Sequence, residues 1–164
     1  MIKKELDTLK NCLEPRPNVV VSCRSEKGED NALAVAYAGN CSYDPPMVMV
    51  GIVPSRYSYK MVKDTGVFVV NLVPEDLEEE YYYLGSHSGR DENKLEELNL
   101  NIEDGKKVDA PLLVDFPVNV ECEVVDSIMT GSHEMFIGKV VQVHINQELV
   151  DEEEIDLSKI DFLI

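Results

Sequence analysis

The sequence predicts a mostly β fold, a closed or split antiparallel barrel with short helices at its rim. Three observations support this. Short valine-rich runs follow one another closely, turn residues separate them, and the regular strand–helix alternation of a doubly wound α/β sheet is missing. No internal repeat or linker interrupts the 164 residues, so we expect one domain over residues 1–164.

The predicted strands are apolar runs bounded by proline, glycine or polar turns. They cover residues 18–25, 31–41, 47–53, 67–73, 117–129 and 135–146. Within 117–129, apolar residues alternate with Asn119, Glu121 and Glu123, which predicts an antiparallel strand with one wet face. The segment 31–41 is rich in small residues, which would let another group approach its backbone closely.

Three helices are expected between these strands. Residues 56–66 show helical spacing and end on Gly66, where a C-terminal cap belongs. Pro74 opens a second helix over 74–85, whose first turn is acidic. The third covers 91–98 with Asp91 as its N-cap.

The charge of the chain excludes some partners. It carries 15 Lys+Arg against 32 Asp+Glu, a net charge of -17, and so acidic a surface repels nucleic acid and anionic membranes. The acidic runs 75–80, 96–105 and 150–156 are interpreted as solvated faces, with a docking patch for a basic redox partner as the alternative. Residues 1–14 contain no apolar core of a secretory signal, and no apolar run reaches membrane-spanning length. We therefore expect a cytoplasmic protein.

Familiar catalytic and metal-binding motifs are missing from the sequence. The four cysteines show no Cys-x-x-Cys spacing, and the scattered histidines give no metal-ligand pattern, so we expect reduced thiols and no metal site. No Gly-x-Gly-x-x-Gly fingerprint supports a Rossmann dinucleotide site, and no Gly-x-Ser-x-Gly elbow supports a hydrolase.

Two clusters of cations and small polar residues predict phosphate binding. Arg56 and Ser58 stand at the start of the first helix, where a guanidinium, a hydroxyl and free backbone N–H groups can bind an anion. The stretch 86–94 provides a second cluster before the third helix, made of Ser88, Gly89, Arg90 and Lys94. Either cluster alone is equally compatible with a plain turn.

Four segments in order resemble the flavin reductase-like family. They are the small-residue strand from Asn31 that continues to Asp44-Pro45-Pro46, the Arg56-Tyr57-Ser58 loop followed by 66–71, the segment 86–94, and Thr130–His133 followed by 136–141. The likeness covers about residues 15–146. It implies an antiparallel Greek-key split barrel of the flavoredoxin type that binds FMN non-covalently near the interface of a homodimer.

The resemblance also implies where the cofactor would lie. The small side chains of Ala32, Ala34 and Ala36 would leave the backbone accessible to a flat flavin ring, and further contacts are expected from the matched positions Asn31, Tyr37, Ser42, Tyr57 and Asn71. His133 is the candidate for contact with a nicotinamide or the ring edge, and a surface turn histidine is the alternative. The chain ends at Ile164, before a C-terminal segment that many relatives have, which weakens the expectation of nicotinamide binding.

Three functions follow as hypotheses. The first is an oxidoreductase that passes electrons from NAD(P)H through FMN to an unidentified acceptor, where the flavin carries the hydride chemistry. The second is a flavoredoxin-type electron carrier that a protein partner reduces. The third is a structural or regulatory split barrel without flavin, against which the two cationic clusters argue.

Overall fold

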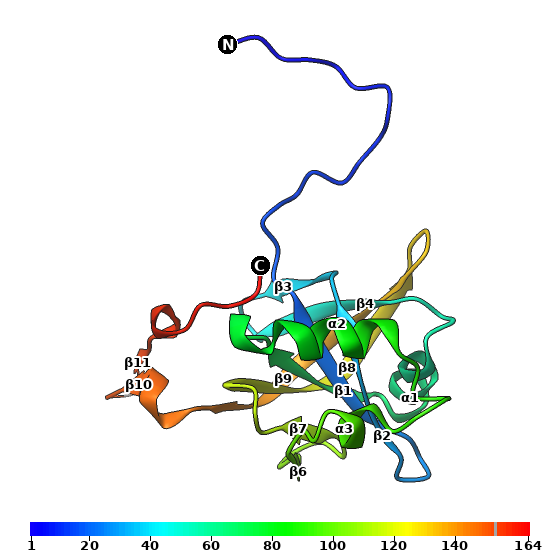
Figure 1. The fold of residues 1–164 in the computed structure, drawn as a ribbon, viewed down its shortest axis with the longest axis vertical. Coiled ribbons are helices and arrows are strands. Elements are labelled where there is room, and N and C mark those ends of the chain that lie inside the picture. Colours follow the sequence, from blue (N-terminus) through cyan, green and yellow to red (C-terminus); the bar gives the residue numbers. More distant parts are fainter. Residues whose placement is uncertain (153) are drawn as a thin grey trace.

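The computed structural model describes residues 1–152 and 154–164 and is built on a seven-stranded antiparallel sheet (Figure 1). The strand order across the sheet is β2-β1-β5-β8-β9-β4-β3. The strands are β1 (Val19–Arg24), β2 (Asp30–Val35), β3 (Ala38–Ser42), β4 (Met47–Ile52), β5 (Val67–Leu72), β8 (Val118–Met129) and β9 (Glu134–Ile145). The mostly β prediction is confirmed, and strands occupy all six predicted runs.

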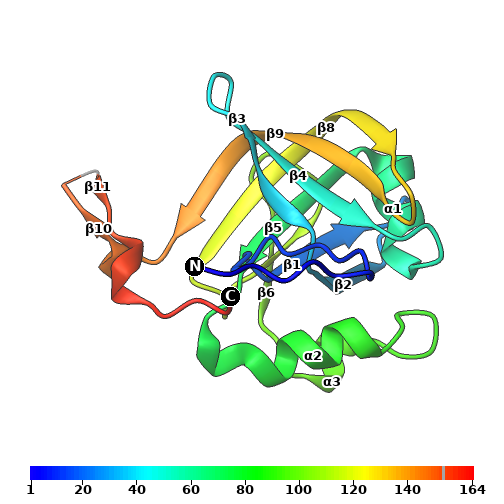
Figure 2. The ribbon, with the colours of Figure 1, turned by 90° about the horizontal axis from the view of Figure 1, so that it is seen from above.

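The sheet curls into an open barrel whose interior is the main core (Figure 2). Side chains of β1, β2, β4, β5 and β9 meet there, among them Phe68 and Phe136, both nearly inaccessible to solvent. Strand β1 is buried on both faces, because Val19 and Val21 point into the barrel while Val20 packs under the helices. This explains why its sequence is a continuous valine run without polar alternation.

Helix α1 (Tyr57–Thr65) connects β4 to β5 across one end of the barrel. It ends as predicted at Gly66, which takes the left-handed conformation (φ 69°) and donates its N–H to the carbonyl of Val62. A residue with a side chain is strained at that φ, so glycine is favoured there.

Helix α2 (Glu78–Ser86) covers the outer face of β1 and β2, preceded by a 3-10 turn at Glu75–Leu77. The predicted 74–85 helix is therefore present, but its first turn is tighter. Gly85 lies within α2 rather than at its end, and a Cβ on it would stand only 3.0 Å from the Cβ of Ala34. Two small residues thus let α2 approach the strand closely.

The third predicted helix is shorter than expected. Helix α3 covers only Lys94–Glu97, and its N-cap is Asn93, whose side chain accepts a hydrogen bond from the N–H of Glu96. The assignment of Asp91 as N-cap was wrong by two residues. Residues 88–93 form an irregular loop instead, and this loop shapes the site described below.

Several short elements were not predicted. Strands β6 (Ile102–Asp104) and β7 (Pro111–Leu113) pair with each other, as do β10 (Val150–Asp151) and β11 (Glu154–Ile155). Arg24 of β1 forms an ion pair with Asp30 of β2. It also pairs with Asp104 and Asp109, and these two contacts hold the β6–β7 segment against the barrel.

Two features of the predicted strands need correction. The run 31–41 is two strands, because the chain bends at Ala36 and Tyr37 between β2 and β3. The outer face of β8 is not wet throughout, since Glu121 is completely buried. Its carboxylate accepts the backbone N–H groups of Lys106, Lys107 and Val108, so the loop before β7 closes over it.

In the part of the chain that the structure describes, no helix is long and apolar enough to cross a membrane.

Candidate functional site

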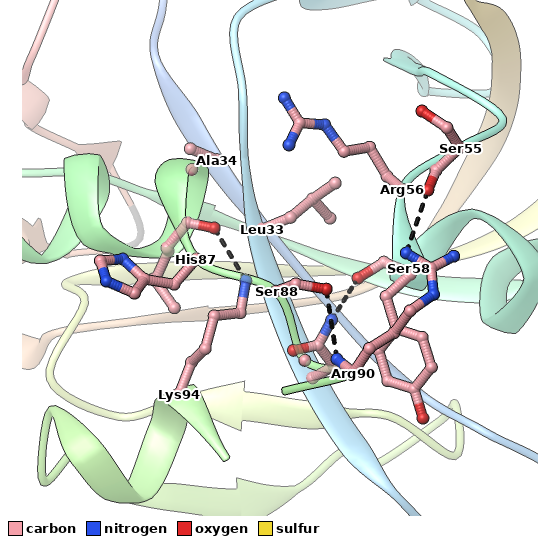
Figure 3. A pocket seen from close by; sticks show the side chains of 14 residues that line it. Leu33, Ala34, Ser55, Arg56, Ser58, His87, Ser88, Arg90 and Lys94 are labelled. Carbon is pink, nitrogen blue, oxygen red and sulfur yellow. Dashed lines mark hydrogen bonds between the residues drawn. The ribbon is translucent and has the colours of Figure 1, made fainter. Parts of the chain in front are cut away.

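A cavity of about 180 Å³ lies where β2, the start of α1 and the loop after α2 meet (Figure 3). Its lining includes both predicted cationic clusters, so they form one site rather than two. The predicted residues that it brings together are Asn31, Ala34, Arg56, Tyr57, Ser58, Ser88, Gly89, Arg90 and Lys94.

The start of α1 forms one wall of the cavity. Arg56 has extended backbone angles (φ -71°, ψ 144°) and immediately precedes the helix, so the free N–H groups of the first turn begin here. Ser58 is almost fully buried, and its hydroxyl oxygen accepts a hydrogen bond of 2.7 Å from the side-chain amide of Asn31. This bond ties α1 to β2 and orients the serine.

The loop 88–90 forms the facing wall and fits tightly against the first. A Cβ on Gly89 would lie 2.6 Å from Oδ1 of Asn31 and 2.7 Å from Cδ1 of Tyr57, so only glycine fits without displacing them. Arg90 donates from Nη1 to the carbonyl oxygen of Ser55 at 3.1 Å, and its guanidinium lies 5.4 Å from the centre of the Tyr57 ring. The two segments predicted to bind phosphate are thereby joined to each other.

Lys94 forms the floor of the cavity. Its side chain is buried, and Nζ donates to the carbonyl oxygen of Leu84 at 2.8 Å, near the C-terminal end of α2. Burial lowers the pKa of Lys94 to about 8; Cys23 partly opposes this effect, and the positive charge of the nearby Arg56 adds to it. An ammonium has three donors, so an anion in the cavity would find donors beyond the one that Leu84 uses.

Figure 3 shows Arg56 and Lys94 reaching toward the cavity from opposite sides. With Arg90 nearby, three of the chain's 15 basic residues surround a small cavity in a protein of net charge -17. Such a concentration of cations, hydroxyls and helix N–H groups suits a phosphate group.

The remaining predicted cofactor residues lie outside this cavity. Ala32 is fully buried beneath the helices, and Ser42 ends β3. Asn71 is also fully buried; its amide donates to the carbonyl of Val20 and to Ser22 Oγ. Asn71 therefore joins β1 to β5 and is not available to a ligand.

His133 stands at the β8–β9 turn, paired with another predicted residue. Its ring meets Tyr37 edge to face with centroids 4.9 Å apart, and its Nδ1 lies 2.7 Å from Ser132 Oγ. Tyr37 and its neighbour Ala36 occupy the bend between β2 and β3. These residues form a second group of predicted positions that does not line the cavity.

The cavity also contains residues that the sequence did not single out: Leu33, Ser55, Leu84, Gly85 and His87. The ring of His87 stacks on Tyr83 at 3.8 Å, and its Nδ1 lies 3.2 Å from the carbonyl oxygen of that residue. Only the position of His87 beside Ser88 could have indicated it. Leu84 and Leu33 line the cavity because α2 packs on β2, and the local sequence does not predict that packing.

The Flavin reductase like domain family matches residues 12–157 of this chain. The chain belongs to this family. The resemblance inferred from the four sequence segments is therefore confirmed, and the matched range includes every residue of the cavity.

Relatives in the family come from archaea and bacteria. An uncharacterised protein of Aeropyrum pernix is 35% identical over 140 residues, which are 85% of this chain and 53% of that protein. One of Archaeoglobus fulgidus is 34% identical over 113 residues, 69% of this chain and 64% of the relative. The chain thus spans somewhat more than half of the length of these relatives.

Solved structures of the family share the fold. Flavoredoxin of Desulfovibrio vulgaris superposes with a TM-score of 0.88 at 27% identity, covering 96% of this chain and 85% of that one. An FMN-binding protein from Thermus thermophilus, solved with bound p-hydroxybenzaldehyde, gives a TM-score of 0.79 at 26% identity, with coverage of 93% and 83%. These neighbours confirm the split-barrel fold.

The cavity fits one part of the cofactor that the family implies. Sites for complete ligands of this class occupy roughly 300–1,000 Å³, whereas this cavity measures about 180 Å³. Its cations and hydroxyls match a phosphate group and the adjoining sugar-alcohol chain. The residues of this flavin reductase-like chain therefore suit the phosphate end of FMN.

Proposed function

We propose that this protein is an FMN-binding redox protein whose cavity holds the phosphate end of the cofactor. The observation that carries the proposal is the buried cation of Lys94 facing Arg56 across a small cavity at the start of α1. Similarity to a flavoredoxin and to an FMN-binding protein supports the same assignment.

Each residue of the cavity has a defined task in this proposal. Arg56 would bind phosphate oxygens as a fork of donors, and Lys94 would hold a proton at Nζ toward the same group. Ser58, oriented by Asn31, would donate its hydroxyl hydrogen to the phosphate while its oxygen accepts from the amide. Leu33 and Leu84 exclude water from the inner wall and so strengthen these charge-assisted bonds.

The flavin ring needs a second surface, and we place it toward the β2–β3 bend. Ala34 lines the cavity, and the chain continues from there through the buried Val35 to Ala36 and Tyr37. Because one chain encloses only the phosphate end, a second copy would supply the rest of the slot. The proposal therefore includes a homodimer.

The chemistry of such a protein belongs mainly to its cofactor. FMN supplies hydride and single-electron transfer when it is bound. The chain binds and orients the cofactor, and no general acid or base among its residues is required. His133, next to Tyr37, is the residue that we propose to contact a nicotinamide or the ring edge.

The leading activity is electron transfer from NAD(P)H through FMN to an acceptor. An electron carrier reduced by a protein partner is the second candidate, favoured by the strongly acidic surface and by the similarity to a flavoredoxin. The donor, the acceptor and the cytoplasmic location stay predictions.

Two measurements test the proposal. The purified protein should be yellow and should release FMN rather than FAD on denaturation; a colourless protein that does not bind added FMN would refute it. Stopped-flow mixing with NADH and with NADPH, followed by flavin absorbance, then separates the two activities. Rapid bleaching indicates the reductase, and a flavin that responds only to a reduced protein partner indicates the carrier.

A further inference from the structure

A second and larger hollow adjoins the phosphate cavity. This groove measures about 840 Å³ and lies between the turn that precedes β2 and the segment that contains α3. Tyr57 and Gly89 line both the cavity and the groove. The Tyr57 ring, with Gly89 against its edge, is therefore the partition between the two spaces.

Tyr57 is held in this position from three directions. Its hydroxyl donates to Glu29 Oε2 at 3.4 Å, Gly89 packs so closely that a Cβ would lie 2.7 Å from Cδ1, and the Arg90 guanidinium sits 5.4 Å from the ring centre. Arg90 is itself fixed by its bond to the carbonyl of Ser55. Three contacts therefore orient the Tyr57 ring between the cavity and the groove.

The groove has the opposite electrostatic character from the cavity. Its lining includes the carboxylates of Glu29, Glu92 and Glu96, together with three asparagine side chains. Its volume would accept a nucleoside, but its charge repels a phosphate. A cavity lined by cations and a groove lined by carboxylates thus lie on either side of Tyr57.

We propose that Tyr57, clamped by Gly89 and Arg90, restricts this site to flavins that end in a phosphate monoester. In FMN the phosphate is terminal and can fill the small cavity. In FAD an anhydride bond joins the same phosphate to a second phosphate that carries the adenosine, and this extension would have to continue through the cavity wall. Tyr57 blocks that path, and the groove carboxylates disfavour the negative charge of the second phosphate.

This assigns Arg90 a different task from the one its sequence suggests. Its guanidinium already contacts Ser55 and the Tyr57 ring, so Arg90 acts as a positioning residue that keeps the wall closed. Arg56 and Lys94 remain the phosphate ligands. The inference rests on the proposed binding of FMN in the cavity. It adds a structural reason for the preference of the protein for FMN over FAD.

The test compares the dissociation constants of FMN and FAD, measured by flavin fluorescence with the full chain. The wild-type protein should bind FMN at least about tenfold more tightly than FAD. This is a modest discrimination for a site that rejects FAD by steric and charge mismatch. Tyr57→Ala should reduce the preference to within about threefold, mainly by improving FAD binding. Tyr57→Phe, which keeps the ring, should retain the preference.

Further variants keep the test decisive. Arg90→Gln removes the guanidinium that holds Tyr57 but leaves Tyr57 itself in place, and it should also reduce the preference for FMN over FAD. Glu92→Lys should favour FAD further in the Tyr57→Ala background. Tyr43→Ala, a truncation at a tyrosine that is almost fully exposed, serves as the matched control and should change neither constant.

The outcomes are distinguishable. If Tyr57→Ala and Arg90→Gln both leave the FMN-to-FAD ratio at the wild-type value, or if the wild-type protein binds both flavins equally, the inference is overturned while FMN binding stands. If the wild-type protein binds neither flavin, the proposed function itself fails. Should Tyr57→Ala not fold, the ratio in Arg90→Gln decides.

Discussion

The side-chain amide of Asn31 donates a 2.7 Å hydrogen bond to the hydroxyl oxygen of Ser58, 27 positions further along the chain. This bond joins β2 to the first turn of α1, and Gly89 packs against the same amide. Three segments that are far apart in sequence therefore meet at one point, and the geometry of the phosphate cavity depends on that junction.

We expect Gly89→Ala to weaken FMN binding because the new Cβ would collide with Asn31 and Tyr57. Overpacking of this kind costs about 1–3 kcal/mol of stability, and because relieving it displaces two residues of the cavity lining, we expect FMN affinity to fall by at most roughly 150-fold. Gly131→Ala is the matched control, since nothing lies within 4 Å of its added Cβ. Equal affinities of the two variants in a fluorescence titration would show that the junction does not shape the site.

Arg56→Ala should weaken FMN binding more than Lys139→Ala. Arg56 lines the cavity at a helix start, and the loss of a charge-assisted contact costs about 1.5–3 kcal/mol, which is about 10- to 150-fold in affinity. Lys139 is an exposed residue of β9, so its removal should change affinity little. Both variants remove one cation from the same acidic chain. Equal effects would mean that general electrostatics holds the cofactor, without a defined phosphate site.

The affinity for FMN should fall as the pH rises above about 8. In the free protein Lys94 has a pKa of about 8, so its ammonium loses a proton above that pH. A bound phosphate favours the charged form, and binding at higher pH must therefore be accompanied by proton uptake, which lowers the affinity by up to about tenfold per pH unit.

The stability of the cofactor-free protein should change in the opposite direction. Between pH 8 and about 10.4 the unfolded chain binds more protons at Lys94 than the folded chain, so this residue makes unfolding less favourable as the pH rises. Lys94→Met tests the role of this residue in the binding of FMN. The variant lacks the titrating group, so its FMN affinity should depend less on pH over this range.

If the FMN affinity of Lys94→Met changes with pH as steeply as that of the wild-type protein, another group causes the pH dependence.

Glu134→Gln should lower stability near neutral pH and leave it little changed in acid. The Glu134 carboxylate pairs with Lys63 and accepts hydrogen bonds from Ser127 and Tyr59, and these contacts lower its pKa to about 2. The unfolded pKa is about 4.3, so the stabilisation is complete above that pH and disappears as the pH falls toward 2.

Thermal unfolding of the Glu134→Gln variant provides the measurement. We expect a melting temperature lower by about 2–4 °C at pH 7, with the difference from wild type closing as the pH falls from about 5 to 2. Glu123→Gln, at an exposed position of β8, is the matched control and should unfold like the wild-type protein. A difference that persists undiminished at pH 2 would contradict the assignment.

Local signals predicted the strands and most of the residues that line the cavity, because these signals depend only on neighbouring residues. The valine run of β1, the Gly66 cap and the pairing of Arg56 with Ser58 all depend on short stretches of chain. The two cationic clusters were nevertheless read as separate sites. That they form one cavity follows from the packing of loop 88–90 on α1, which no local pattern contains.

Tertiary contacts explain the errors. Asn71 stands in a matched family segment, yet the strand pairing of β1 with β5 places its amide inside the sheet. Glu121 occupies a position that alternation assigns to solvent, but the loop with Lys106 and Lys107 closes over it. Arg90 lines the cavity, as expected of a phosphate ligand, and its contacts with Ser55 and Tyr57, more than 30 positions earlier, are ones that no local pattern contains.

The protein should be a homodimer, and its FMN affinity should depend on protein concentration. The open barrel leaves the outer edges of β2 and β3 without a neighbouring strand in the described chain, and Val125, Ile128 and Met129 of β8 are exposed. In the proposed function a cavity of about 180 Å³ holds only the phosphate end, and we expect a second copy to contribute to the slot for the ring. Dilution below the dimer dissociation constant should then release FMN, because cofactor binding and association are linked. Light scattering and flavin fluorescence over a dilution series measure both quantities. A monomer at micromolar concentration that still holds FMN would contradict the shared site.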